Sequence, residues 1–234
     1  PLYFFDLDAI GALARAALDL VDGDDDVPMA LLAALSHLVE AHQLVPAGTP
    51  GAERSVALFE RNLLAALIDR QGAIATNLQA LGRTSGALRD RLSPEQWGLV
   101  RRMDDSFKAP FERAGASVPT AAQVLPALQR LTLQLAAMTG AQTDRMTRDH
   151  GWRLLSVGRL IERLAGMATA LATLLEAFDE RGGSTATTEL LLELFDSRIT
   201  FRARYQRHED LLALADLLVQ DDTNPRAFAG TLRR

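Results

Sequence analysis

The feature that most constrains the fold is a series of apolar residues at helical spacing in the second half of the chain. The spacing predicts one helix from about Asp149 to Phe178. Seven apolar residues share one stripe of it: Leu154, Val157, Ile161, Leu164, Ala168, Leu171 and Leu175. Such a stripe is typical of a helix that packs against a core.

The composition extends this prediction to the rest of the chain. Leu and Ala dominate, while Val, Ile and the aromatic residues are sparse, which favours helices over pleated sheets. With 234 residues, of which 48% are hydrophobic, the chain is long enough to bury a sizeable core. We therefore expect an all-α protein.

Capping residues and glycine or proline breaks predict the helix boundaries. The further predicted helices are 28–44, 55–69, 73–92, one that starts at Ser93, 124–138, 184–205, 211–219 and one that starts at Asn224 and Pro225. Thr120 and Gln123 resemble a capping box. The segment 184–205 is apolar on several faces, so we expect it to be a central helix with little solvent exposure. Short connections predict one domain, residues 1–234, built as an antiparallel bundle of about eight to ten helices.

Charge and residue usage argue against several classes of function. A net charge of -5 argues against a nucleic-acid surface or a membrane surface, since both require clustered basic residues. The chain has no cysteine, which agrees with a reducing compartment, and its four histidines lack the helical spacing of a metal site. The uncharged runs are too short to cross a bilayer, which needs about 20 apolar residues. We expect a cytoplasmic protein without metal or cofactor.

Two charged segments are the candidates for a functional site. The first runs from Arg145 through Trp152 to Arg163. Gly158 and Glu162, together with Gly166 just beyond this segment, form a row that a neighbouring backbone could approach closely.

The second segment contains Glu193 and Asp196, followed by several arginines and Tyr205. If the two segments pack together, Arg159, Glu162 and Arg163 could join Glu193 and Asp196 in a partly buried ionic network. Such a network either fixes the packing register or binds a ligand, because an arginine fork holds a carboxylate in a bidentate manner.

At these residues the sequence resembles a known family. The order and spacing of three motifs are similar to those of the Alpha-E family, an uncharacterised bacterial helical domain named for a Glu-Arg motif. The motifs are Arg148-Asp149-x-Gly151-Trp152-Arg153 with Gly158-Arg159-x-Ile161-Glu162-Arg163, then Leu194 to Tyr205, and then Asp222-x-Asn224-Pro225-Arg226. With Arg89 to Trp97, the resemblance covers about residues 60 to 234.

The resemblance implies two related halves. The first half, about 1–145, is degenerate or truncated, because Ile10 and Gly11 stand about where its Glu and Arg would fall. The second half, about 146–234, carries the intact motifs. The resemblance also implies association with a circularly permuted ATP-grasp ligase, fused or separate, in a peptide-forming or peptide-modifying system.

The leading hypothesis is a non-catalytic helical accessory module that binds this ligase or an acidic peptide. The residues expected to bind are Arg145, Arg148, Asp149, Trp152, Arg159, Glu162, Arg163, Glu193, Asp196, Arg202, Arg204, Tyr205, Asn224 and Arg226. One alternative is an enzyme in its own right, in which Glu162 or Glu193 acts as general base beside arginines that hold an anionic substrate. Another alternative is an oligomerisation scaffold, which would form a homo-oligomer through a large apolar surface.

Overall fold

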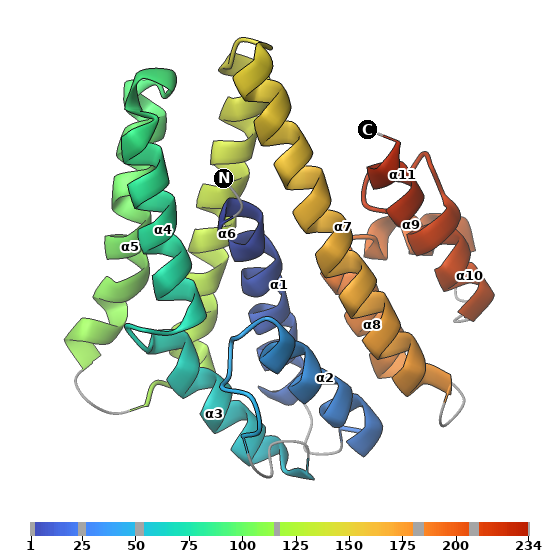
Figure 1. Cartoon of the computed structure of the whole chain (residues 1–234). Coiled ribbons are helices and arrows are strands. Elements are labelled where there is room, and N and C mark those ends of the chain that lie inside the picture. Colours follow the sequence, from blue (N-terminus) through green and yellow to red (C-terminus); the bar gives the residue numbers. More distant parts are fainter. Residues whose placement is uncertain are drawn as a thin grey trace.

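The computed structural model describes residues 3–22, 27–49, 54–114, 118–179, 185–205 and 211–233, and these form an all-α bundle (Figure 1). Its elements are α1 (Tyr3–Asp22), α2 (Met29–Ala41), α3 (Val56–Ile68), α4 (Ala73–Ala87), the 3-10 turn η2 (Arg89–Arg91), α5 (Pro94–Ala114), α6 (Ala121–Arg145), α7 (His150–Asp179), α8 (Thr185–Leu194), α9 (Arg198–Tyr205), α10 (Leu211–Ala215), the π-helical turn η3 (Asp216–Gln220) and α11 (Phe228–Leu232). The predicted all-α class is confirmed. The division into two related halves stays a prediction.

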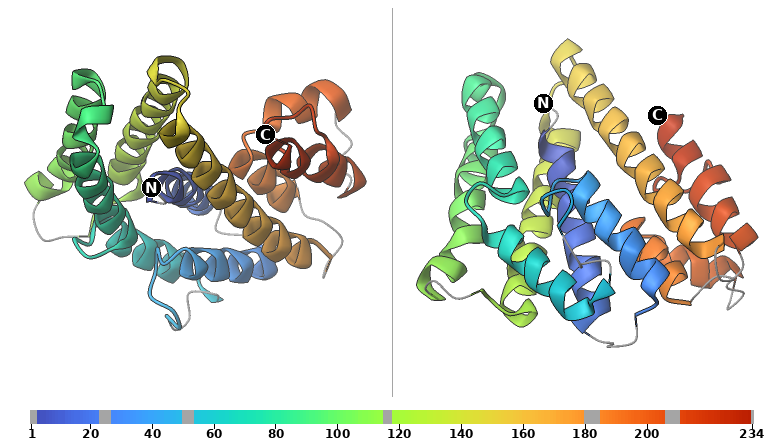
Figure 2. Two further views of the ribbon diagram at one scale, coloured as in Figure 1. Left: turned by 45° about the horizontal axis from the view of Figure 1, so that its top comes forward. Right: turned by 60° about the horizontal axis from the view of Figure 1, so that its bottom comes forward.

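The helix at the centre of the bundle is α1. The segment 184–205, expected to be a central helix, packs against α1 through α8, whereas Ile199 of α9 is exposed. Helix α1 packs against α2, α3, α4, α6, α7 and α8. Figure 2 shows it surrounded by these helices. Leu7, Ile10, Ala14 and Leu18 are completely buried. Alanines between the larger residues give α1 small side chains on several faces, so neighbouring helices can approach it closely.

The predicted helix 184–205 is in fact two helices with a turn between them. The Ser197 N–H donates to the Leu192 carbonyl at 2.8 Å, and the Asp196 N–H donates to the Glu193 carbonyl at 3.0 Å. These bonds form a Schellman motif, which ends α8. Asp196 occupies its left-handed position with a φ of 46°. Because no glycine or proline marks this break, the helical periodicity continues through it in the sequence.

The last helix also differs from its prediction, since α11 begins at Phe228 and not at Asn224. The start signal at Ser93 is confirmed, because the Ser93 N–H donates to Gln96 Oε1 at 2.9 Å and α5 follows. The Thr120 N–H likewise donates to Gln123 Oε1 at 3.0 Å, so the capping box that starts α6 is confirmed.

The apolar stripe of α7 is covered only in its last part. Leu171 is buried, but Leu154, Val157 and Ile161 are 73%, 52% and 58% exposed. The prediction that the stripe packs on the core is therefore wrong for the first half of α7. The periodicity identifies an apolar face, but not whether the bundle is wide enough to cover it. No helix among the described residues is both long and apolar enough to span a membrane.

Candidate functional site

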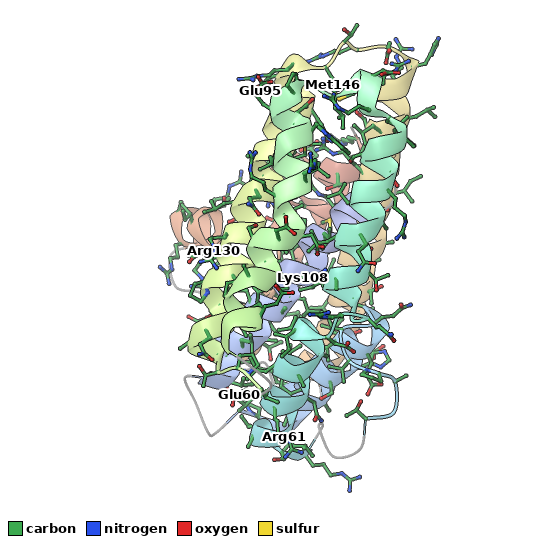
Figure 3. All side chains as sticks on the ribbon, turned by 90° about the vertical axis from the view of Figure 1, so that its left-hand side faces the viewer. Glu60, Arg61, Glu95, Lys108, Arg130 and Met146 are labelled. Carbon is green, nitrogen blue, oxygen red and sulfur yellow. The ribbon has the colours of Figure 1, made fainter. Side chains whose placement is uncertain are left out.

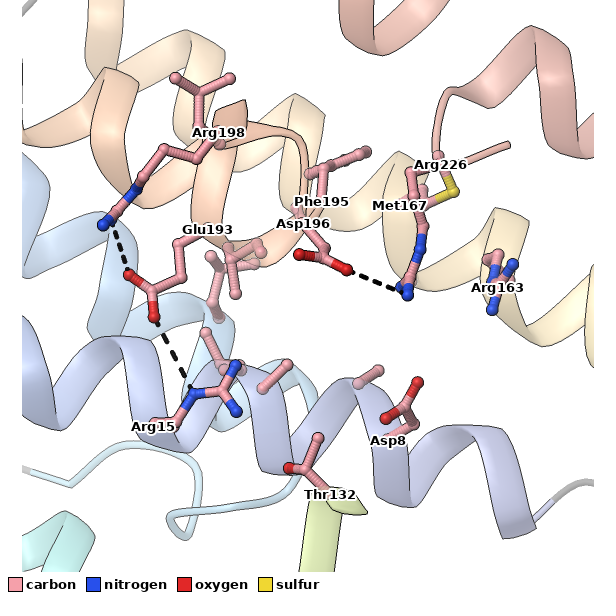
Figure 4. Close-up of a pocket in the computed structure, with 18 of the residues that line it drawn as sticks. Asp8, Arg15, Thr132, Arg163, Met167, Glu193, Phe195, Asp196, Arg198 and Arg226 are labelled. Atoms are coloured by element: carbon pink, nitrogen blue, oxygen red, sulfur yellow. Dashed lines mark hydrogen bonds and ion pairs between the residues drawn. The ribbon is translucent and has the colours of Figure 1, made fainter. Parts of the chain in front are cut away.

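A pocket of about 680 Å³ lies between α1, α2, α6, α7 and the turn that joins α8 to α9. Four arginines line it: Arg15 of α1, Arg163 of α7, Arg198 of α9 and Arg226, which precedes α11 (Figure 4). Three carboxylates, those of Asp8, Glu193 and Asp196, line the same pocket. Four separate parts of the chain thus bring guanidinium groups to one cavity.

Glu193 lies between two of these arginines. Its Oε1 is 3.9 Å from Arg15 Nε, and its Oε2 is 3.0 Å from Arg198 Nη2. The Glu193 side chain is 26% exposed, so the contact with Arg198 is partly shielded from water. Both oxygens of the Glu193 carboxylate therefore face a guanidinium group.

Asp196 and Arg226 form a further ion pair of the pocket, at 3.1 Å between Oδ2 and Nη2. The buried Asn224 sets the position of Arg226, because its Oδ1 accepts the Arg226 N–H at 3.0 Å. The Asn224 amide nitrogen donates to Ser197 Oγ at 3.3 Å and to the Leu217 carbonyl at 3.2 Å. Two motifs that are separate in the sequence therefore meet at this turn.

Gly230 allows α11 to lie against the Asn224 turn. A Cβ atom at Gly230 would stand 2.1 Å from the Asn224 carbonyl oxygen, which is too close for any other residue. The next residue, Thr231, is buried and its hydroxyl contacts Met167 Sδ of α7 at 3.8 Å. Helix α11 thus fixes the loop that carries Arg226 on the side of α7.

Apart from Arg159 and Glu162, the predicted binding residues fall into three groups. Those at the pocket are Arg163, Glu193, Asp196 and Arg226, with Asn224 behind them. The expected network between the two charged segments has other partners, because Glu193 pairs with Arg15 and Arg198, and Asp196 pairs with Arg226. Sequence reasoning missed Arg15, since no motif surrounds it in α1.

The other α7 residues of the Glu-Arg motif do not line the pocket. Arg159 and Glu162 lie on neighbouring faces of α7, and one carboxylate oxygen of Glu162 is shielded from solvent. Gly166 does line the pocket, and a Cβ there would stand 4.0 Å from Ala9 of α1. Apart from the backbone of its own helix, a Cβ at Gly158 would meet no atom of the described chain within 4 Å, so the predicted close approach at Gly158 is wrong.

The second group builds the start of α7 rather than the pocket. Asp149 Oδ1 accepts the Trp152 N–H at 3.0 Å, and Asp149 also pairs with Arg91 of η2. The backbone N–H of Trp152 and the Arg91 guanidinium hold the pKa of Asp149 below its usual value. The Arg148 guanidinium lies over the Trp152 ring at 5.3 Å. Arg145, at the end of α6, lies near the same corner, where Figure 3 shows Glu95 and Met146.

The third group connects α9 to the segment that follows η3. Arg204 pairs with Asp221 and donates to Thr223 Oγ1 at 3.1 Å. Hydrogen bonds from Thr223, followed by the Arg204 contact, lower the pKa of Asp221. The Tyr205 hydroxyl donates to Asp216, which raises the pKa of Tyr205. Arg202 is exposed on α9 and does not line the pocket.

Comparison with known proteins supports the motif assignment. The model of the Alpha-E family, described as "a predicted alpha-helical domain with a conserved ER motif", matches residues 10–234. An uncharacterized protein of Mycobacterium tuberculosis and another of Mycobacterium bovis are each 25% identical over 167 residues, which is 71% of this chain and 19% of each relative. The chain thus spans about a fifth of the length of these relatives. No solved structure matches it significantly.

The family match begins at residue 10 and so extends further toward the N-terminus than the motifs alone indicated. It includes most of α1 as well as all the residues that form the pocket from α7 onward. The chain belongs to the Alpha-E family.

Proposed function

We propose that this chain is a non-catalytic binding module whose arginine-lined pocket takes a ligand that carries carboxylate groups, such as an acidic peptide. The observation that carries this proposal is the convergence of Arg15, Arg163, Arg198 and Arg226 on one cavity. Arginine forks match carboxylates in geometry and charge, and such bonds are roughly twice as strong as bonds between neutral groups.

The residues that line the pocket support this ligand class. Glu193 and Asp196 are themselves carboxylates, and each lies against an arginine of the pocket. The pocket therefore already contains the type of contact that an acidic ligand would make. The net charge of the chain is -5, which repels acidic peptides from most of the surface, so their binding would depend on a local group of arginines.

The alternative of an enzyme that uses Glu162 or Glu193 has less support. A general base must be free to accept a proton within hydrogen-bond reach of the substrate. Glu193 lies between Arg15 and Arg198, and Glu162 does not line the pocket. We therefore propose recognition of the ligand without chemistry on it.

Membership of the Alpha-E family supports a wider proposal about the partner. The partner would be a circularly permuted ATP-grasp ligase, fused or separate, that forms an amide bond on the peptide held by this module. In that system the pocket would bind the acidic peptide while the ligase supplies the chemistry.

Isothermal titration calorimetry of the purified chain with triglutamate tests the pocket, with triglutamine as the neutral control peptide. We expect Arg226→Gln to weaken triglutamate binding about 10-fold or more, because a hydrogen bond to a charged group contributes roughly 1.5–3 kcal/mol. Arg130→Gln is the matched control, since Arg130 is exposed on α6 and lies about 200° around the helix from the pocket residue Thr132 (Figure 3). Equal affinity for both peptides would refute the proposal.

Binding of the proposed ligase needs a separate measurement, because the peptide could bind without the ligase. The same chain would be titrated with a purified circularly permuted ATP-grasp ligase in the presence and absence of triglutamate. We expect a complex in both conditions. Absence of any complex would remove the ligase from the proposal and leave the peptide pocket standing on its own result.

A further inference from the structure

The first half of α7 exposes an apolar stripe on the side away from the pocket. Leu154, Val157 and Ile161 are 73%, 52% and 58% exposed. Three small residues continue this stripe toward the end of the helix, and these exposed alanines are Ala165, Ala168 and Ala172. At 100° per residue all six lie within about 80° of one another around the helix, and Arg163 lies on the opposite side.

The order of large and small residues makes this stripe complementary to itself. If a second α7 lies antiparallel to the first at the level of residue 163, Leu154 faces Ala172, Val157 faces Ala168 and Ile161 faces Ala165. Each large side chain would then pack against a small one, which lets the two helices approach closely. A parallel pair would place large residues against large ones and leave the alanines apart.

The exposed charges at the two ends of the stripe favour the same arrangement. His150 and Arg153 lie near the start of α7, and Glu176 lies near its end, all of them exposed. In an antiparallel pair Glu176 of one copy comes beside His150 and Arg153 of the other. In a parallel pair like charges would be neighbours, and the helix dipoles would also repel one another.

We propose that this stripe is the interface through which two copies of the chain form an antiparallel, two-fold symmetric dimer. The contact would extend over about 27 Å of each helix, because 18 residues separate Leu154 from Ala172. One pair of helices gives an interface at the low end of the usual size range, so the dimer should form reversibly. Arg163 faces away from the stripe, so the dimer leaves the pocket open.

Cross-linking tests the antiparallel register directly, because the chain has no cysteine of its own. Leu154→Cys and Ala172→Cys are prepared separately and treated with a short bis-maleimide, alone and as an equal mixture. We expect covalent dimers in the mixture only, because residues 154 and 172 meet only across the antiparallel pair. Dimers from either variant alone, or no dimers from the mixture, would overturn the proposed register.

Sedimentation equilibrium tests whether the stripe causes association at all. We expect the unmodified chain to dimerise with rising concentration, and Ile161→Glu to weaken this association about 10-fold or more. Leu133→Glu is the matched control, because Leu133 is an equally exposed apolar residue, 66% exposed, on α6. A monomer at every concentration, or equal weakening by both variants with unchanged helical circular dichroism, would refute the proposal.

Discussion

Replacement of Asp196 by glycine separates the backbone requirement of the α8–α9 turn from the role of its carboxylate. Asp196 has a φ of 46°, in the left-handed region that costs a residue with a Cβ roughly 1–2 kcal/mol. Glycine removes that cost, but it gives the unfolded chain more conformational freedom. This freedom lowers the free energy of unfolding by about 0.4–1 kcal/mol. It also removes the ion pair with Arg226. The Asp196 side chain is 76% exposed, so this pair should contribute only about 0–1 kcal/mol.

These contributions nearly cancel, so we expect Asp196→Gly to change the free energy of unfolding by less than about 1 kcal/mol. Asp196→Ala retains the backbone strain and also loses the ion pair, and it should be about 1 kcal/mol less stable than the glycine variant. Urea denaturation followed by circular dichroism measures all three proteins. If the glycine variant loses as much stability as the alanine variant, the carboxylate and not the backbone decides the stability of this turn.

Three further predictions concern the elements that surround the pocket. Asn224→Ala should lower the free energy of unfolding, measured in urea, by about 3 kcal/mol. The reason is that the Ser197 hydroxyl and the Leu217 carbonyl lose the side-chain amide that donates to them. A loss below about 1 kcal/mol would contradict this role. Gly230→Ala should lower the thermal midpoint and reduce the free energy of unfolding by about 1–3 kcal/mol, because its Cβ would stand 2.1 Å from a carbonyl oxygen. An unchanged midpoint would contradict this close contact. The lowered pKa values of Asp149 and Asp221 stabilise the fold above the unfolded-state value of about 3.9, and this stabilisation is lost as pH falls through the folded-state values. As pH falls below about 4, Asp221→Asn should therefore lose less stability than the unmodified chain does, as measured by thermal melts. Equal losses in the two proteins would contradict this prediction.

Much of the helical framework could be predicted because its signals are local. The capping pairs at Ser93 and Thr120 start their helices where predicted, since a cap depends on residues within one turn. The break at Asp196 could not be predicted, because an aspartate in the left-handed position leaves no glycine signal. Asn224 was interpreted as a helix start, yet it is buried and its amide joins two distant segments.

The candidate site was predicted only in part, because a pocket depends on which helices become neighbours. Arg163, Glu193, Asp196 and Arg226 carry motif signals and do meet at the pocket. Arg15 has no local signal, and it contributes only because α1 passes through the centre of the bundle. The motif residues around Asp149 build the start of α7, and their expected binding of a ligand or partner stays a prediction.

We propose that the four arginines of the pocket act together on one acidic ligand. The most direct test is the arginine side-chain Nε–Hε NMR spectrum of the chain, titrated with triglutamate and with triglutamine. We expect the signals of Arg15, Arg163, Arg198 and Arg226 to shift and saturate together with triglutamate, while that of Arg130 stays in place. Equal shifts at Arg130 and the pocket arginines, or no shift with triglutamate, would contradict it.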